Sequence, residues 1–513
     1  MAILNNIKIS LGHSLDEFVF KAVPEAKSFR ILKKSLDARK KANIHHVYNI
    51  QTFETEEPPA LAFEELEKVA NKEDKVVNII GAGPAGLFAA LRLIERGIPC
   101  RLIERGKPVT ERMRDISRHW KKGIVDPDSN VCFGEGGAGT FSDGKLITRV
   151  KSPYIRYVME QLVRFGAPEE ILYLSNPHVG SNKIRKVIHS LTEYLKENDC
   201  DVRFESRAEN FEWSEDSLDA ATDQNGDKLA GDYWVMATGH AAHEVYEELF
   251  KGDVPMEAKS MAMGFRVEHP QGWVNQAQYG SKWDSEELPD AANYKLTCHD
   301  KDSDIGVYSF CMCPGGYVLA SSAQPEQMVC NGMSNYNHGS GFANSGIVIT
   351  IDKDDWYPEG ARQALNFQTM IEKKTFKKVK EAGGTVEVPA QKVKDFIANK
   401  TGEVGRSSCP SGVIAVNMRD IYPAKLTKAF VKAMKNFERK MPGFVADEAL
   451  LHGVESRTSS PIRVLRDKKT LVSPKYKNLY PAGEGAGFAG GITSAAADGV
   501  RIAEAIIAEM SES

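Results

Sequence analysis

Apolar and polar positions follow two patterns along the chain. The first is typical of short buried strands and amphipathic helices. A continuous apolar run from Val76 to Ile80 is typical of a strand that is buried on both faces. Apolar residues then recur at helical spacing from Leu87 to Ile94, with Pro84 in the first turn. A second apolar run, Cys100–Ile103, ends at Glu104. The pattern predicts a strand–helix–strand unit of an α/β domain.

The same pattern returns at the end of the chain. Residues 478–482 are predicted to form a strand, 483–491 a glycine loop and 492–509 an alanine-rich helix. A further apolar run, Tyr233–Met236, ends in Ala-Thr-Gly. We expect it beside the first strand, because small residues there let the chain turn past a ligand. These segments predict one Rossmann-like domain that is split in the sequence.

The second pattern begins near Met256 and is an alternation of apolar and polar residues. Met261–His269 alternates like a sheet strand. Further strands are predicted over 305–311, 316–321 and 346–351, and helices over 361–381 and 424–439. Near the N-terminus we predict strands over 3–9, 29–34 and 46–53, and a helix from Ser14, as N-cap, to Val23.

The predicted fold class is therefore α/β with several units. The expected organisation is a small N-terminal α+β module (1–55), a linker with a connecting helix over 61–72 (56–74), a split Rossmann-like domain (75–255 and 451–513) and an inserted mixed α+β substrate domain (256–450). A chain of 513 residues is too long for one simple core.

The turn after the first strand has the chemistry of a phosphate site. Gly81, Gly83 and Gly86 have the spacing G-x-G-x-x-G. The first glycine allows the tight turn, the second lets the backbone approach a pyrophosphate, and the third lets helix and strand pack closely. The N–H groups and positive dipole at the helix start, near Pro84 and Ala85, favour the same anion.

An acidic residue completes this unit. Glu104 stands 18 residues beyond Gly86, where a carboxylate accepts from the adenosine ribose, and Arg105 lies beside it. An ordinary glycine-rich turn explains neither this register nor the acid. The unit therefore predicts an adenine dinucleotide, whose adenine we expect near Arg207 and Ala208.

Two more glycine segments indicate which dinucleotide binds. Residues 134–139 repeat the glycine spacing without flanking strands, so we expect this loop to lie against a large flat group such as a flavin; a flexible loop is the alternative. A cofactor that needs the C-terminal loop and helix as well is longer than the first phosphate site, which favours FAD. The further residues expected to bind it are Gly136, Gly137, Ala138, Thr238, Gly239, Gly483, Glu484, Gly490, Gly491 and Ile492.

Composition narrows the choice of partners. A net charge of −4 gives no case for nucleic acid or an anionic membrane, and no apolar run is long enough to cross a bilayer. The first ten residues lack the features of a signal peptide, and eight scattered cysteines fit a reducing cytoplasm. We expect a cytoplasmic protein with a small-molecule substrate. The basic run 33–41 is either an RNA-binding patch or, more in keeping with an isolated charge run, a solvated turn.

Several long strings resemble one family of proteins. They are 35–39, 133–145, 306–317, 453–461 and 480–491. The last of them reads Tyr-Pro-Ala-Gly-Glu-Gly-Ala-Gly-Phe-Ala-Gly-Gly. The chain resembles the uncharacterised FAD-dependent dehydrogenases, within the glutathione-reductase type of flavoproteins with two dinucleotide-binding domains. The resemblance implies non-covalent FAD and an oxidoreductase, and it supplies no substrate. NAD(P)H, if used, would bind transiently at the flavin face.

Four residues are candidates for catalysis near the flavin N5. Glu135 and Lys145 lie in the second glycine segment, where loop capping is the alternative. Arg457, in a cluster of arginines and hydroxyls, could bind a carboxylate or phosphate, or join the two domains structurally. His240 follows the Ala-Thr-Gly turn and could move a proton, although a lone histidine is more often structural; the same holds for His269.

Cys311 and Cys313 admit two interpretations. Because residues i and i+2 share a face of a strand, they could act together as a redox thiol pair beside the flavin. The usual redox spacing is C-x-x-C, and buried cysteines are more often core residues. No metal site is expected, since no His/Cys pair at ligand spacing lies nearby.

These observations predict an FAD-dependent oxidoreductase that passes hydride through flavin N5 between a small molecule and a second redox partner. Two alternatives stay open: a flavin-dependent RNA-modifying protein anchored by the N-terminal module, and a flavin-binding scaffold or sensor without turnover.

Overall fold

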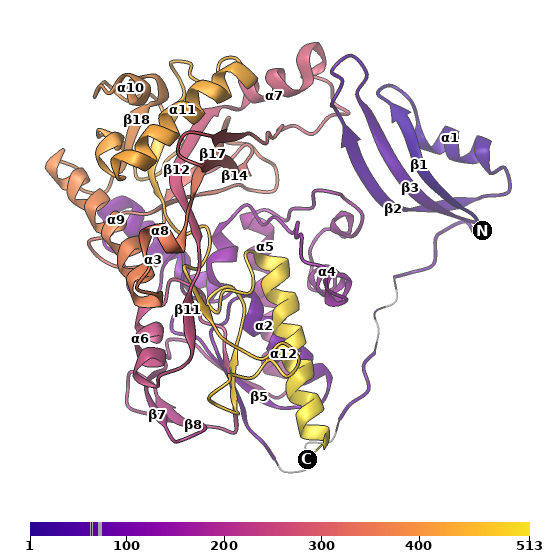
Figure 1. Cartoon of the computed structure of the whole chain (residues 1–513). Helices are drawn as coiled ribbons and strands as arrows, with labels where there is room; N and C mark the ends of the chain where they lie inside the picture. Colours follow the sequence, from indigo (N-terminus) through magenta and orange to yellow (C-terminus); the bar gives the residue numbers. More distant parts are fainter. Residues whose placement is uncertain (62, 64, 70–73, 513) are drawn as a thin grey trace.

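The computed structural model describes residues 1–61, 63, 65–69 and 74–512. Its N-terminal module stands at one end of the molecule (Figure 1) and consists of β1 (Ile3–Ser10), α1 (Leu15–Ala22), β2 (Ser28–Asp37) and β3 (His45–Phe53). The three strands are antiparallel in the order β1-β3-β2. Ser14 caps α1 as predicted, since its hydroxyl accepts from the Glu17 N–H at 3.3 Å.

The basic run 33–41 is not a turn over its whole length. Strand β2 continues beyond its predicted end at Lys34 to Asp37, so the first five residues of the run are strand residues. The backbone of Lys34 also docks the module on the rest of the chain: its N–H donates to the Tyr173 carbonyl at 2.7 Å, and its carbonyl accepts from the Ser175 N–H at 2.9 Å.

Five parallel strands form the first large sheet. Their order is β22 (Leu479–Pro481), β10 (Tyr233–Met236), β4 (Val77–Ile80), β5 (Cys100–Ile103) and β6 (Cys200–Arg203). The predicted pairing of β10 with β4 is confirmed, and the structure adds that β10 pairs with the C-terminal strand β22 on its other side. This sheet is the Rossmann-type part of a mixed α/β fold, as the sequence predicts.

Helices α2 (Pro84–Glu95) and α12 (Ile492–Glu512) lie side by side against this sheet (Figure 1). They share an apolar core with α4 (Tyr154–Arg164) and α5 (Ser181–Glu197). The contact between α2 and α12 is so close that a Cβ at Gly499 would lie 2.0 Å from the Ala85 carbonyl oxygen. Segments from opposite ends of the chain are therefore packed backbone to backbone.

The other face of the sheet carries smaller elements. They are α6 (His243–Lys251) and the antiparallel sheet β7 (Glu209–Trp213), β8 (Leu218–Thr222) and β9 (Lys228–Ala230). Helix α3 (Val109–Lys122) instead packs through Ile116 on Val131 and Phe141. Short 3₁₀ turns lie at Gly137–Phe141, Glu169–Leu172, Gly280–Lys282 and Met418–Asp420.

A seven-stranded sheet forms the middle unit. Its order is β13 (Thr297–Asp300), β14 (Ile305–Cys313), β17 (Phe342–Ile351), β12 (Met261–Pro270), β20 (Leu450–Glu455), β18 (Val388–Lys392) and β19 (Val413–Ala415). All pairings are antiparallel except β18 with β19. Strand β20 crosses the expected boundary at residue 450, so the middle unit extends to Glu455 at least.

Helices and two small ribbons complete the middle unit. The helices are α7 (Gln271–Tyr279), α8 (Lys353–Trp356), α9 (Ala361–Glu381), α10 (Val393–Ala398) and α11 (Ala424–Lys440). The ribbons pair β11 (Met256–Ala258) with β21 (Ile462–Val464), and β15 (Tyr317–Ala320) with β16 (Cys330–Met333). Phe265 of β12 packs on Phe430 of α11 in this core, with ring centroids 5.1 Å apart.

The connecting segment differs from expectation. Residues 61, 63 and 65–69 are not helical, and the other residues of the helix expected over 61–72 lie outside the described residues.

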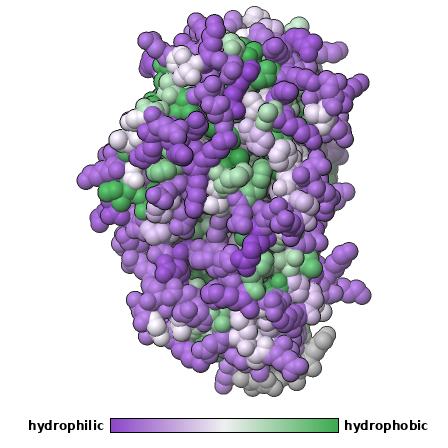
Figure 2. Space-filling view, turned by 60° about the vertical axis from the view of Figure 1, so that its left-hand side comes forward, coloured by the Kyte–Doolittle hydropathy of each residue, from purple (hydrophilic) through white to green (hydrophobic). Residues whose placement is uncertain are grey.

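In Figure 2 the visible face is mostly hydrophilic, with hydrophobic residues in separate small groups. Within the described part of the chain, no helix combines the length and apolar character needed to span a membrane.

Candidate flavin site

The turn between β4 and α2 has the geometry that its glycines predict. Gly81 has φ +105°, and a Cβ there would lie 2.5 Å from the Ala237 carbonyl oxygen. A Cβ at Gly86 would lie 1.9 Å from the Gly81 carbonyl oxygen, so strand and helix meet without room for a side chain. Gly83, by contrast, has free space beside it, because the atom nearest to an added Cβ is the Gly137 Cα at 4.0 Å.

The second glycine loop packs on this turn. The Gly136 N–H donates to the Ala82 carbonyl at 2.8 Å. A Cβ at Gly137 would lie 3.1 Å from the Gly83 Cα, and one at Gly139 would lie 2.9 Å from Ile492 Cγ1. The loop therefore joins the first turn of α2 to the first residue of α12, and the close partners of these glycines are the chain itself.

The C-terminal glycine loop closes on the same place. Gly483 has φ +66°, and a Cβ there would lie 2.9 Å from the Ala85 Cβ. Its N–H donates to the Asp498 carboxylate at 2.8 Å, and Arg466 donates to the same carboxylate at 2.6 and 3.0 Å. Asp498, which sequence reasoning missed, thus ties the loop to α12. A Cβ at Gly485 would lie 2.6 Å from the Gly239 carbonyl oxygen.

Several glycines of these segments face open space. Gly239, Gly490 and Gly491 have no atom within 4 Å of an added Cβ, and Gly83 has only the Gly137 Cα at that limit. Tightly packed glycines thus alternate with glycines that face open space, in three segments that the fold brings together. This is the arrangement expected where backbone must approach a pyrophosphate and a flavin closely.

Glu104 is buried and holds the turn together. One carboxylate oxygen accepts from the Ala82 N–H at 2.9 Å, and the other accepts from the N–H groups of Gly106 and Gly134, each at 2.9 Å. A carboxylate offers about four acceptor positions, so about one stays available to a ribose hydroxyl. The sequence assigned Glu104 only to the ribose, whereas the structure adds this backbone role.

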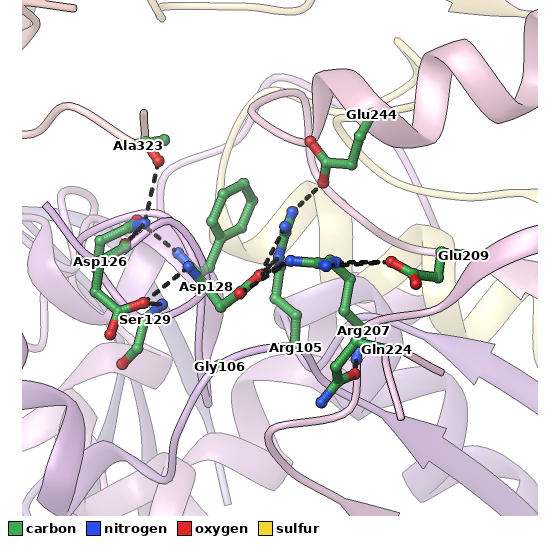
Figure 3. Close-up of polar contacts among 12 residues, drawn as sticks. Arg105, Gly106, Asp126, Asp128, Ser129, Arg207, Glu209, Gln224, Glu244 and Ala323 are labelled. Carbon is green, nitrogen blue, oxygen red and sulfur yellow. Dashed lines mark hydrogen bonds and ion pairs between the residues drawn. The ribbon is translucent and has the colours of Figure 1, made fainter. Parts of the chain in front are cut away.

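Arg105 lies in a network of opposite charges beside Glu104 (Figure 3). Its guanidinium donates to Asp128 at 2.8 and 3.0 Å and also to Glu244. Arg207 donates to both oxygens of Asp128 at 2.9 Å and to Glu209 at 3.2 Å. Asp128 therefore joins the two residues that the sequence placed at the adenosine end, and it carries no motif that would have revealed it.

Lys145 faces a carboxylate next to the start of α12. Its Nζ lies 3.4 Å from the Asp143 carboxylate. Burial opposes the charge of Lys145, but the Asp143 carboxylate outweighs it and keeps the pKa of Lys145 above its ordinary value. The next residue, Leu146, accepts at its carbonyl from the Thr493 hydroxyl at 2.8 Å. Lys145 is thus a cation held beside the N-terminus of α12.

The other three catalytic candidates have structural partners. Glu135 is buried and accepts from the Val109 N–H at 2.6 Å, so it caps α3. Arg457 makes two 3.0 Å hydrogen bonds to the buried Glu372 carboxylate, which favours the structural alternative. His240 Nδ1 lies 3.5 Å from the predicted FAD residue Glu484.

A polar cluster forms next to Lys145, which pairs with Asp143 and forms a β-bridge with His178. The His178 ring stacks on His338 at 4.3 Å between centroids, and the His178 Nε2 lies 3.3 Å from the Tyr336 carbonyl oxygen. The Ser334 hydroxyl donates to the Asp143 carboxylate. Sequence reasoning missed Asp143, His178 and His338, because their positions in the chain show no shared spacing. His269, by contrast, is buried against Phe444 elsewhere.

Cys311 borders this cluster and carries a testable pH dependence. A hydrogen bond from Cys313, with the positive charges of Lys145 and Arg266 and against the negative charge of Asp143, lowers the pKa of Cys311 to about 6. We expect the rate of alkylation of Cys311 by iodoacetamide to rise through about pH 6 and level off above it, because the thiolate is the nucleophile.

Mass spectrometry of the modified peptide, sampled at several pH values, measures this profile. Lys145→Met should move the midpoint upward, since it removes one of the two positive charges. A wild-type midpoint near the ordinary value of 9.0 would contradict the prediction. By linkage, the stabilising effect of this thiolate is present above its ordinary pKa and is lost as the pH falls through about 6.

The parallel sheet, the glycine turn and the open glycines define a class of protein, the FAD-binding flavoproteins of oxidoreductase type, and comparison with known proteins agrees. Residues 73–117 match a family model described as FAD binding domain. Residues 260–458 match a model described as FAD-dependent protein, C-terminal domain-like. FAD is thus the cofactor of this protein.

An uncharacterised protein of Clostridium beijerinckii is 37% identical to this chain, and the match covers 98% of both. The chain belongs to the same family as this protein. Among solved structures, it is similar to CtdE in complex with FAD, with 13% identity, a TM-score of 0.33 and coverage of 85% of this chain and 91% of that one. It is also similar to the halogenase PltM, with 9% identity, a TM-score of 0.42 and coverage of 86% and 71%.

Proposed function

We propose that this protein is an FAD-dependent oxidoreductase that passes hydride between a small-molecule substrate and a second redox partner. One observation carries the proposal: the turn 81–86, the loop 483–491 and the start of α12 converge, and the Lys145–Asp143 pair lies beside them. Bound FAD would supply the two-electron chemistry at its N5 atom. The residues of the chain position it and supply charge.

The proposed roles of the backbone groups and of Lys145 follow from the charges that they carry. The backbone N–H groups of α2 and the residues Gly81 to Gly86 would hold the pyrophosphate, and the loop 483–491 the ribityl chain. The N-terminus of α12 would favour negative charge at the pyrimidine edge of the flavin. Lys145, protonated at neutral pH, would add a positive charge on that side and orient an anionic substrate group.

Dehydrogenase activity with a nicotinamide donor is the finer form of this proposal. Among the described residues only the five-stranded sheet is wholly parallel, and the middle sheet is largely antiparallel. The presence of one parallel sheet supports a single dinucleotide-binding domain, whereas flavoproteins of the glutathione-reductase type have two. In this protein NAD(P)H would therefore bind only transiently. A cytoplasmic location is part of the proposal, and the free state of all eight cysteines supports it.

Anaerobic reduction tests the proposal. The purified yellow protein is mixed with NADH, NADPH and a panel of metabolites, and the loss of flavin absorbance is followed by stopped flow. We expect at least one donor to bleach the flavin. Flavin that resists every donor would contradict an oxidoreductase and favour the scaffold or sensor alternative. The RNA-modifying alternative has no further observation in its favour.

A further inference from the structure

Cys311 and Cys313 lie in a bulge of strand β14. Between the pairs Phe310–Gly346 and Cys313–Asn344, β14 has two residues, Cys311 and Met312, where β17 has one, Ser345. Cys311 has φ +42°, which is the left-handed region that few residues other than glycine adopt. Bulges re-aim side chains next to active sites. Here the bulge leaves Cys311 exposed, while Cys313 is fully buried.

The two thiols have different surroundings. Arg266, which is itself fully buried, donates to the Cys311 carbonyl at 3.3 Å and lies 3.9 Å from the Cys313 Sγ. The Cys313 Sγ also donates to the Cys311 carbonyl at 3.6 Å. With Lys145 close by, positive charge favours a thiolate at the exposed Cys311. Burial raises the pKa of Cys313, as does its hydrogen bond to Cys311, so Cys313 keeps its proton.

The thiols are also joined to the flavin site. Lys145, which lowers the pKa of Cys311, is followed by Leu146, and Leu146 is hydrogen-bonded to Thr493 in the first turn of α12.

The spacing of the two cysteines suits a disulfide. The Cα atoms of residues two positions apart on a strand are separated by roughly 6.6 Å. Disulfides span about 4.4–6.8 Å between Cα atoms, so this spacing lies within the range that a disulfide bridges.

We propose that Cys311 and Cys313 form a redox-active dithiol that exchanges two electrons with FAD and with an external thiol or disulfide substrate; this rests on the proposed function. In the oxidising direction, the Cys311 thiolate and the Cys313 thiol form one S–S bond. The pair loses two electrons and the Cys313 proton, and oxidised FAD takes up all three as one hydride equivalent. In the reverse direction, the Cys311–Cys313 disulfide takes two electrons and a proton from reduced FAD and returns to the thiolate and thiol. The Cys311 thiolate then attacks an external disulfide and expels one thiolate, and Cys313 resolves the mixed disulfide and releases the second thiol.

Counting electrons tests this proposal without an activity assay. The flavin-loaded protein is oxidised with diamide, freed of reagent and titrated anaerobically with dithionite while flavin absorbance is followed. We expect the wild type to take up about four electrons per flavin, because the dithiol and the flavin are each two-electron couples. Cys311→Ser, at an exposed position, should take up about two.

Cys200→Ala is the matched control. Cys200 lies 3.6 Å from Cys100 between their Sγ atoms, a second close pair of thiols far from the site, and its loss should leave about four electrons per flavin. Peptide mapping of the oxidised wild type should show one disulfide, between Cys311 and Cys313. A wild type that binds flavin but takes up about two electrons overturns the dithiol alone. Protein that purifies without flavin overturns the proposed function instead.

Discussion

Gly83→Trp is expected to purify as colourless protein. The glycine has an ordinary negative φ of −76°, so the new residue adopts the backbone without strain. Only the Gly137 Cα lies at 4.0 Å from an added Cβ, so the indole would enter the open space that we assign to the pyrophosphate. We expect FAD affinity to fall at least 100-fold, which corresponds to about 2.7 kcal/mol. Flavin absorbance per chain, followed by titration with free FAD, measures the loss.

Gly272→Trp is the matched control for this change. Gly272 is exposed in α7, and no atom lies within 4 Å of an added Cβ, so a tryptophan there is equally well tolerated but far from the glycine turn. This variant should purify yellow. If Gly83→Trp retained full flavin content, our position for the pyrophosphate would be wrong.

Arg266→Met is expected to lower the free energy of unfolding by about 3–5 kcal/mol. Arg266 has no exposed surface and donates to both oxygens of Glu455, at 2.7 and 2.8 Å, and to the Asn344 side chain at 2.7 Å. Methionine fills a similar volume but leaves the Glu455 carboxylate buried without its partner. The large effect comes from this uncompensated charge rather than from the lost contacts. Urea unfolding followed by tryptophan fluorescence measures it.

Two further variants separate this cause from others. The double variant Arg266→Met with Glu455→Met removes both charges and should recover most of the lost stability. Lys228→Met breaks an exposed pair, with Glu212 at 2.9 Å, and should cost less than about 1 kcal/mol. An Arg266→Met variant as stable as Lys228→Met would show that the buried pair contributes little.

Much of the cofactor half of the fold was predictable from neighbouring residues. Continuous apolar runs and glycine spacing are local properties, and they located β4, α2, β5 and the C-terminal strand within one or two residues. They also predicted correctly that β10 lies beside β4, whereas the pairing of β10 with β22 came only from the structure. Local patterns failed at boundaries: β2 extends into the supposed basic turn, and β20 belongs to the middle sheet rather than to the C-terminal part.

The sequence by itself thus determined the fold class and the glycine segments that we propose for FAD, because turns and strand burial depend on residues a few positions apart. Which polar groups meet was decided only by the tertiary structure. Arg266 and Glu455 are 189 positions apart, and Asp143 meets Ser334 across 191. Pairs so distant leave no periodic trace in the chain, and the charge around Cys311 depends on several such contacts at once.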